Sequence, residues 1–202
     1  MRAPVTYWFM GAPSEDLVAW ARDLARGYLD VPQFRDARWR HVQAVGAKAA
    51  ALAPAFGIDG DILVAAAWLH DIGYSPELAR TGFHPLDGAR LIARAGQRRI
   101  AALVAHHSGA GLEARLRGLG DDMAEFRDEQ SPVRDALWAC DMTTSPTGQP
   151  VTFGARLAEI ENRYGRDHSV ARAISAASAD IRRAIAATGA RASNVGSDLG
   201  MR

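Results

Sequence analysis

The sequence predicts an all-α fold, a single-domain helical bundle. Apolar residues recur at steps of three and four along most of the chain, as they do on the buried face of a helix. Alternating Val, Ile and Thr patterns, which would predict strands, are nearly absent. No repeat or change of composition marks a second domain. We therefore expect one helical domain over residues 14–188, an N-terminal segment over 1–13, and a flexible tail over 189–202.

Three helices are expected in the first third of the chain. Ser14, with two acidic residues after it, is a capping signal, because its hydroxyl can accept from free backbone N–H groups. Gly57 supplies a stop for the second helix, and the stretch 73–76 breaks the third. The expected helices are 14–29, 36–56 and 59–70.

The remaining helices follow similar start and stop signals. Pro85 and Pro132 each stand where a first helical turn tolerates proline. The stretch 109–130 is rich in glycine and charge, which favours a surface excursion with one short helix near 121–127. The other expected helices are 84–95, 97–107, 131–141, 153–164 and 167–188.

Composition excludes several functional classes. The chain has 202 residues, and its 24 basic and 23 acidic residues nearly cancel, so charge alone would not recruit a nucleic acid polymer or an anionic membrane. The longest apolar run, 62–69, is far too short to span a bilayer. The single cysteine, Cys140, forms neither an internal disulfide nor a Cys-rich zinc site. We expect a cytoplasmic protein without a membrane or nucleic acid partner.

Histidines and aspartates gather near the expected helix ends and inner faces. Neutral imidazole and carboxylate bind first-row transition metals, and a carboxylate can bridge two ions with its two oxygens. The adjacent His70 and Asp71 cannot share a helix face, but at a helix end released by Gly73 both can turn towards one point. The residues concerned are His41, His70, Asp71, His84, His106, His107 and Asp141.

The order of these residues resembles that of a known family. A lone His41, the motif LHDIG at 69–73 and a distant Asp141 in ACDMTT match the pattern of the HD-domain metal-dependent phosphohydrolases over about 38–164. The motifs GFHPLDGA at 82–89 and VAHHSG at 104–109 are similar to the second-metal histidines of the binuclear members. The resemblance implies the HD-type helical bundle and hydrolysis of a phosphate ester by a metal-bound hydroxide.

The resemblance also implies a ligand set. A first ion would be held by His41, His70, Asp71 and Asp141, and a second by His84 and His107, with Asp71 bridging the pair. We favour His107 over His106 as the ligand because it stands directly before a serine. The predicted catalytic residues are Asp71 and His106, and His106 is expected to contact the substrate. A His-rich set favours two divalent transition ions, of iron, manganese, nickel or cobalt, over magnesium.

The substrate is expected to be a nucleotide or another small phosphorylated molecule. Several residues near the ligands are candidates to contact the substrate. The arginines and the lysine could bind its phosphate, and Tyr74 and Thr144 adjoin the ligands. The candidates are Arg38, Arg40, Lys48, Tyr74, Arg80 and Thr144. Tyr74 follows HDIG where cyclic-dinucleotide-cleaving relatives carry lysine, and their GYP signature is missing, so that substrate is not supported.

Two alternatives remain open at this point. The same six ligands in the same order match the mixed-valent di-iron oxygenases of the superfamily, so that oxygen chemistry is an alternative to hydrolysis. A domain that keeps its ligands for stability and acts as a non-catalytic metal-binding regulator is the other. We prefer the phosphohydrolase, because most relatives with this arrangement are phosphohydrolases.

Overall fold

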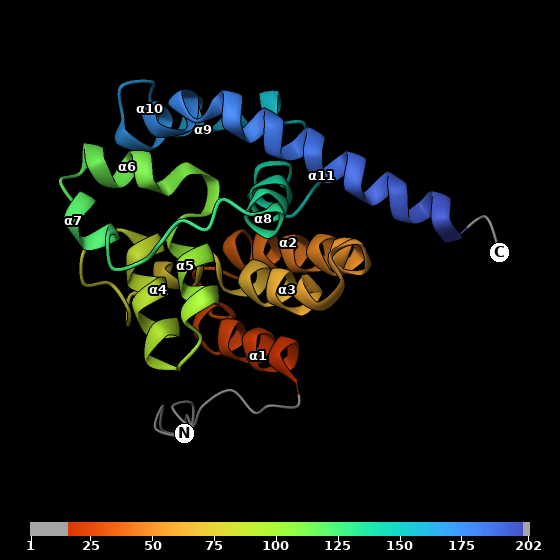
Figure 1. Ribbon diagram of the computed structural model, residues 1–202. Helices are drawn as coiled ribbons and strands as arrows, with labels where there is room; N and C mark the ends of the chain where they lie inside the picture. The colour runs from red at the N-terminus through yellow and green to blue at the C-terminus, as the bar shows by residue number, and fades with distance from the viewer. Residues whose placement is uncertain (1–15, 200–202) are drawn as a thin grey trace.

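The computed structural model describes residues 16–199, with side chains through Asn194, and its regular structure is helical (Figure 1). The described part of the chain has no strand, only an isolated bridge between Thr144 and Pro150. The all-α prediction is confirmed. The α-helices are α1 (Leu17–Leu29), α2 (Arg38–Leu52), α3 (Gly60–Leu69), α4 (His84–Arg94), α5 (Arg98–Ala105), α6 (Ala110–Leu116), α7 (Gly120–Met123), α8 (Pro132–Met142), α9 (Phe153–Tyr164), α10 (Ser169–Ala176) and α11 (Ser178–Leu199). Three short 3₁₀ segments join them, η2 (Ala53–Asp59), η3 (Ile72–Tyr74) and η4 (His107–Gly109).

Two hydrophobic clusters hold the helices together. The larger one is built from α1 to α5 with residues of α6, α7 and part of α8, and α1 and α2 both pack against α3 within it. The smaller one joins α9, α10 and α11 to the other side of α8, through Trp138 and Met142. Figure 1 shows these C-terminal helices, in blue, lying across α8 from the N-terminal layer. Helix α8 therefore contributes to both clusters, and the space beside it is bounded by both layers.

Side-chain caps fix the beginnings of several helices. Asp16 accepts a hydrogen bond from the backbone N–H of Ala19 at 2.7 Å and begins α1. Ser131 and Thr152 cap α8 and α9 in the same way, each three residues before the N–H that it accepts from. The predicted cap Ser14 and the N-terminal segment 1–13 lie outside the described residues.

Several predicted boundaries are wrong. The second helix ends at Leu52 rather than residue 56, because Pro54 lies in a tighter 3₁₀ segment and Gly57 has a positive φ of 55°. The predicted excursion 109–130 contains α6 as well as α7, and α6 buries Ala114. The expected helix 167–188 is two helices that meet at Ala177.

The last helix continues well beyond its predicted end. Helix α11 runs to Leu199, so the described part of the segment expected as a flexible tail is helical. Along the helix, Ile181 and Ala184 pack in the smaller hydrophobic cluster. The glycine and serine residues that suggested fraying are compatible with a helix that is anchored by packing near its start.

One stretch of the described chain, Arg38–Tyr74, is long and apolar enough to cross a membrane by length and composition. In the structure this stretch folds back on itself at Gly57, and α2 and α3 lie side by side (Figure 1). Its apolar residues, such as Val45, Leu63 and Leu69, are buried in the larger hydrophobic cluster. They serve as the packing surface of the domain.

Candidate metal centre

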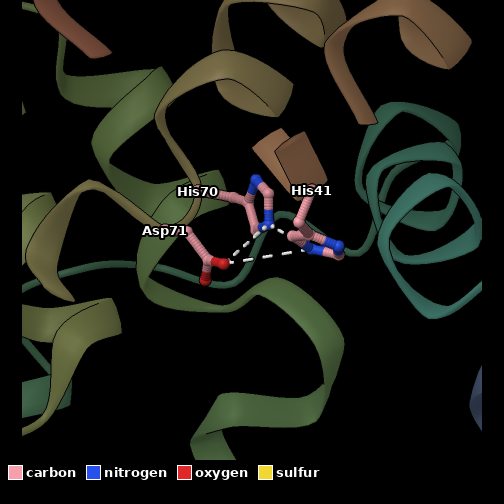
Figure 2. A group of neighbouring side chains, drawn as sticks. All are labelled: His41, His70 and Asp71. Carbon is pink, nitrogen blue, oxygen red and sulfur yellow. Dashed lines mark hydrogen bonds and ion pairs between the residues drawn. The ribbon is translucent and has the colours of Figure 1, made fainter. Parts of the chain in front are cut away.

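A first cluster of possible ligands lies where α2, the end of α3 and the end of α8 meet. Figure 2 shows three of its members, His41, His70 and Asp71, around a common centre. The Nε2 atoms of the two histidines are 3.2 Å apart, and the Asp71 Oδ2 atom is 3.5 Å from that of His70. Asp141 completes the group, with Oδ1 3.1 Å from Nε2 of His41. All four residues are buried.

A second cluster lies on the other side of Asp71. The Nε2 atoms of His84 and His107 are 3.3 Å apart. The Asp71 Oδ1 atom is 3.4 Å from Nε2 of His84 and 3.9 Å from that of His107. Asp71 therefore turns one oxygen towards each cluster, which is the arrangement that a bridging carboxylate requires.

Local structure explains how neighbouring residues reach the two clusters. His70 follows the last residue of α3, and Asp71 lies between α3 and η3, so the two side chains leave the helical path in different directions. His84 begins α4 directly before a proline that suits this position. Gly73 permits the close approach of η3 to α4, because a Cβ atom there would lie 2.0 Å from the carbonyl oxygen of His84.

Hydrogen bonds set the tautomers of three histidines. The Nδ1 atoms of His41, His70 and His107 lie 3.0, 2.8 and 2.6 Å from the carbonyl oxygens of Ser145, Ala67 and Val104. A carbonyl only accepts, so each Nδ1–H donates and each Nε2 of the neutral ring carries a lone pair. The lone pairs of His41 and His70 then face each other at 3.2 Å. Such a pair is unfavourable alone, and a cation held by both rings would relieve it.

The protonation states also suit a metal. Burial lowers the pKa of His70, and it lowers the pKa of His84 to about 3. Burial by itself raises the pKa of Asp71 and of Asp141. The charge of Arg38 together with the neighbouring histidines outweighs burial for Asp71, and the contacts with His41 and the other histidines together outweigh it for Asp141, so both carboxyl pKa values lie below the usual range. Neutral imidazoles and ionised carboxylates are the forms that coordinate metal ions.

The distances fit metal coordination. Ligand atoms about 2.0 to 2.2 Å from one ion, in tetrahedral or octahedral geometry, lie roughly 3.0 to 3.6 Å from each other. The separations between each histidine Nε2 atom and the other ligand atoms of its cluster run from 3.1 to 3.9 Å, close to this range. The residues present therefore fit two neighbouring ions with Asp71 between them.

Two further residues hold these ligands in place. The guanidinium of Arg38 donates to Asp71 Oδ2 at 2.5 Å and lies 3.5 Å from the centre of the Tyr74 ring, which in turn stacks on His84 at 3.8 Å. The hydroxyl of Ser108 donates a short hydrogen bond to Asp141 Oδ2. Ser108 has a positive φ of 50°, uncommon for a residue other than glycine, and this conformation follows directly after His107.

A cavity of about 570 Å³, including its mouth, opens over the two clusters between the N-terminal and C-terminal layers. One side is polar and includes Asp71, His84, His107 and Asp141. The other side comes from α9 and α10 and is largely apolar, with Ile160 and Ile174. Two arginines of α9, Arg156 and Arg163, also line the cavity.

The sequence did not indicate all of these residues. Ser108, Arg156 and Arg163 were not predicted as site residues. With 24 basic residues, of which only Lys48 is not arginine, composition gives no reason to select particular arginines. A signal was available, because residues 156 and 163 are seven positions apart and so share a face of one helix.

Of the predicted substrate contacts, Arg38 and Tyr74 line the cavity and four others do not. Arg40 is exposed and pairs with Asp36, and the side chain of Arg80 is exposed and donates to the carbonyl of the preceding residue. Lys48 donates to the backbone carbonyl of Thr143 and to the hydroxyl of Thr144. These contacts stabilise the end of α8, where carbonyl groups lack helical partners.

His106 also faces away from the centre. Its Nε2 atom lies 2.8 Å from the carbonyl oxygen of Phe126, and its ring lines a different cavity, beside Arg134 and Trp138. Helix α5 ends at Ala105 and η4 begins at His107, so the side chains of His106 and His107 point in different directions. His107 is therefore the member of the pair that reaches the cluster, and His106 does not reach the cavity as the substrate contact that was expected.

Comparison with known protein families matches residues 38–145, more than half of the chain, to the HD domain. The matched range contains all six residues of the two clusters and ends before α9. Comparisons with the curated proteins and with the solved structures give no significant match.

Proposed function

The chain belongs to the HD domain family, and on this basis we propose that it is a metal-dependent phosphohydrolase acting on a small phosphorylated molecule. The observation that carries the proposal is the position of Asp71, whose two carboxylate oxygens each face one cluster of histidines. Two clusters that share a carboxylate suit a pair of divalent transition ions, and iron, manganese, nickel and cobalt all favour such ligands.

A pair of bound ions would supply Lewis-acid chemistry, which lowers the pKa of water and neutralises charge on phosphoryl oxygens. The chain's own residues prepare the site for this. Arg38 orients Asp71, and Ser108 orients Asp141, so the carboxylates do not need to reorganise when substrate arrives. Burial lowers the pKa of His84 to about 3, which keeps its ring neutral near neutral pH.

The cavity supports a small substrate. It is lined by both polar and apolar side chains, as small-molecule sites are. The apolar residues Met142, Ile160 and Ile174 offer a surface for the organic part of a nucleotide or another ester. We therefore propose a small phosphate ester as the substrate, with neither a nucleic acid polymer nor a membrane as partner.

The test combines metal analysis with substrate screening. Purified protein, loaded with Mn²⁺ and desalted, is assayed for phosphate release from nucleotides and simple phosphomonoesters, with a chelated sample as the control. We expect release that chelation abolishes. Oxygen consumption with diols or phosphonates, without phosphate release, would instead support the oxygenase. A loaded protein that is inert in both assays would support a non-catalytic regulatory domain.

Single-ligand variants should separate the two clusters. We expect His84→Ala to reduce the bound metal from about two ions per chain to about one, because His84 contacts only the Asp71 Oδ1 side. Activity should fall by roughly a hundredfold, because the remaining ion can no longer share the phosphoryl charge. Elemental analysis of the desalted protein measures the change.

The matched control is His168→Ala. His168 caps α10, stacks on Tyr164 and belongs to neither cluster, so its loss should leave the metal content unchanged. If His84→Ala retained the wild-type metal content, the second ion would not be held as proposed.

A further inference from the structure

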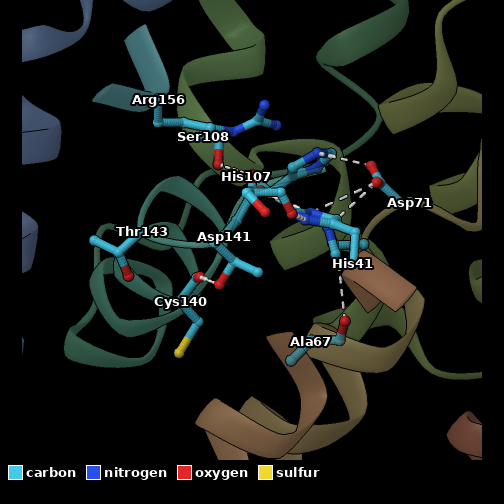
Figure 3. A network of polar contacts seen from close by, with 12 residues as sticks. His41, Ala67, Asp71, His107, Ser108, Cys140, Asp141, Thr143 and Arg156 are labelled. Atoms are coloured by element: carbon cyan, nitrogen blue, oxygen red, sulfur yellow. Dashed lines mark hydrogen bonds and ion pairs between the residues drawn. The ribbon is translucent and has the colours of Figure 1, made fainter. Parts of the chain in front are cut away.

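The side of the cavity formed by α9 carries positive charge that the chain does not balance. Arg156 and Arg163 lie two helical turns apart and both line the cavity over the metal clusters. Figure 3 draws Arg156 together with Ser108 and His107, which line the same cavity. Both arginines are paired with the same residue, Glu159, through short hydrogen bonds to its two carboxylate oxygens. Two guanidinium groups thus share one carboxylate.

Arg156 also keeps an unused hydrogen-bond donor. Its side chain is only 11% exposed, and its Nε–H is among the few buried side-chain groups of the described residues without a partner in the chain. A buried donor without a partner costs free energy, and ionised donors cost more than neutral ones. A ligand oxygen in the cavity could satisfy this group.

The other charged groups around the cavity are already balanced. Arg38 is engaged with Asp71. Glu113, the acid on the opposite side, is paired with Arg117 at 2.6 Å. The free positive charge of the wall is therefore that of Arg156 and Arg163. Among the described residues, the carboxylates that line the cavity, Asp71, Asp141 and Glu113, are engaged with Arg38, Ser108 and Arg117.

We propose that Arg156 and Arg163 form a subsite for a second anionic group of the substrate, a phosphoryl group linked to the one bound at the metal clusters. This inference rests on the proposed function and narrows its substrate to the class of diphosphates and triphosphates. A planar guanidinium binds phosphate oxygens with directed, charge-assisted hydrogen bonds, so the pair suits this role better than a general positive field. The subsite comes from α9, which lies beyond the matched range 38–145.

The test compares two non-reacting probes on protein loaded with Mn²⁺ and desalted. Orthophosphate carries one phosphoryl group, and methylenediphosphonate carries two joined by a carbon that cannot be hydrolysed. We expect the wild-type protein to bind methylenediphosphonate at least about tenfold more tightly in calorimetric titration, because the second group adds charge-assisted hydrogen bonds. Metal content is measured before and after titration, to exclude removal of the ions by the probe.

Arg156→Met and Arg163→Met should each lose most of this preference, while the affinity for orthophosphate changes by less than about threefold. Arg163 is the more exposed of the two, so its variant remains informative if Arg156→Met folds poorly. The matched control is Arg166→Met. Arg166 lies just beyond α9 with its side chain 84% exposed, and it does not line the cavity.

The outcomes separate this inference from the proposed function. If both variants kept the preference of the wild type, or weakened both probes equally, the second subsite would be refuted while the metal centre stood. If the wild-type protein held no metal or failed to bind orthophosphate, the proposed function itself would fail, and the subsite with it. Loss of the preference in both variants, with metal content unchanged, would establish the subsite.

Discussion

Asp71→Ala should remove both bound ions and reduce phosphohydrolase activity by on the order of a thousandfold or more, because this carboxylate serves both clusters and no other side chain replaces it. Each of its oxygens lies within 3.5 Å of a histidine Nε2, one in each cluster. Elemental analysis and phosphate release, measured on the same preparation, follow the two losses together.

The control for this variant removes a carboxylate elsewhere. Asp122 pairs with Arg90 at the surface, and Asp122→Ala should change neither the metal content nor the activity. Asp71→Asn keeps the shape of the side chain and shows whether loss of metal follows from charge rather than from misfolding. Full turnover by Asp71→Ala would contradict the assignment of Asp71 as the bridging ligand.

Gly73→Ala should destabilise the fold and disturb the centre at the same time. The new Cβ atom would lie 2.0 Å from the carbonyl oxygen of His84 and 2.7 Å from the backbone nitrogen of Gly88. Backbone atoms cannot rotate away as a side chain can, so η3 and α4 must separate. We expect the free energy of unfolding to fall by about 3 kcal/mol or more. Urea denaturation of the metal-free protein measures this change.

The matched control is the same substitution at Gly27. That residue lies exposed within α1, and nothing is within 4 Å of the position that its Cβ would take. Gly27→Ala should therefore raise stability by roughly 0.5 to 1 kcal/mol, since alanine favours a helix more than glycine does. Equal effects of the two substitutions would contradict the close approach of η3 and α4 as the cause. Gly73→Ala should also weaken metal binding, because separating α4 moves His84 away from Asp71.

Local signals in the sequence predicted the helices well where caps, prolines and periodicity agreed. The helix 153–164 has the predicted bounds, and Pro132 begins α8 as expected. The break at Ala177 has no local cause of this kind. Ala177 lies against Gly109, where an added Cβ would be 2.8 Å from its own, so contact between distant segments accompanies the break. Such contacts cannot be read from a single stretch of sequence.

The candidate site divides in the same way. The ordered histidines and aspartates indicated both clusters, because imidazole and carboxylate groups in this order are typical metal ligands. The seven-residue spacing places Arg156 and Arg163 on one helix face but does not show what this face meets, and only the packing of the C-terminal layer brings them to the cavity. Lys48 illustrates the opposite error, since its proximity to His41 along the helix suggested a phosphate contact, whereas its ammonium binds the end of α8.

The long sequence separation between ligands gives the centre a further role. His41 and Asp141 are 100 residues apart, and they meet at 3.1 Å. An ion bound between them would join two segments that are far apart in the chain. Because the pocket for the ion exists only in the native chain, occupancy would pull the equilibrium towards that state by mass action. Metal supply in the cell would then govern how long the protein survives as well as whether it works.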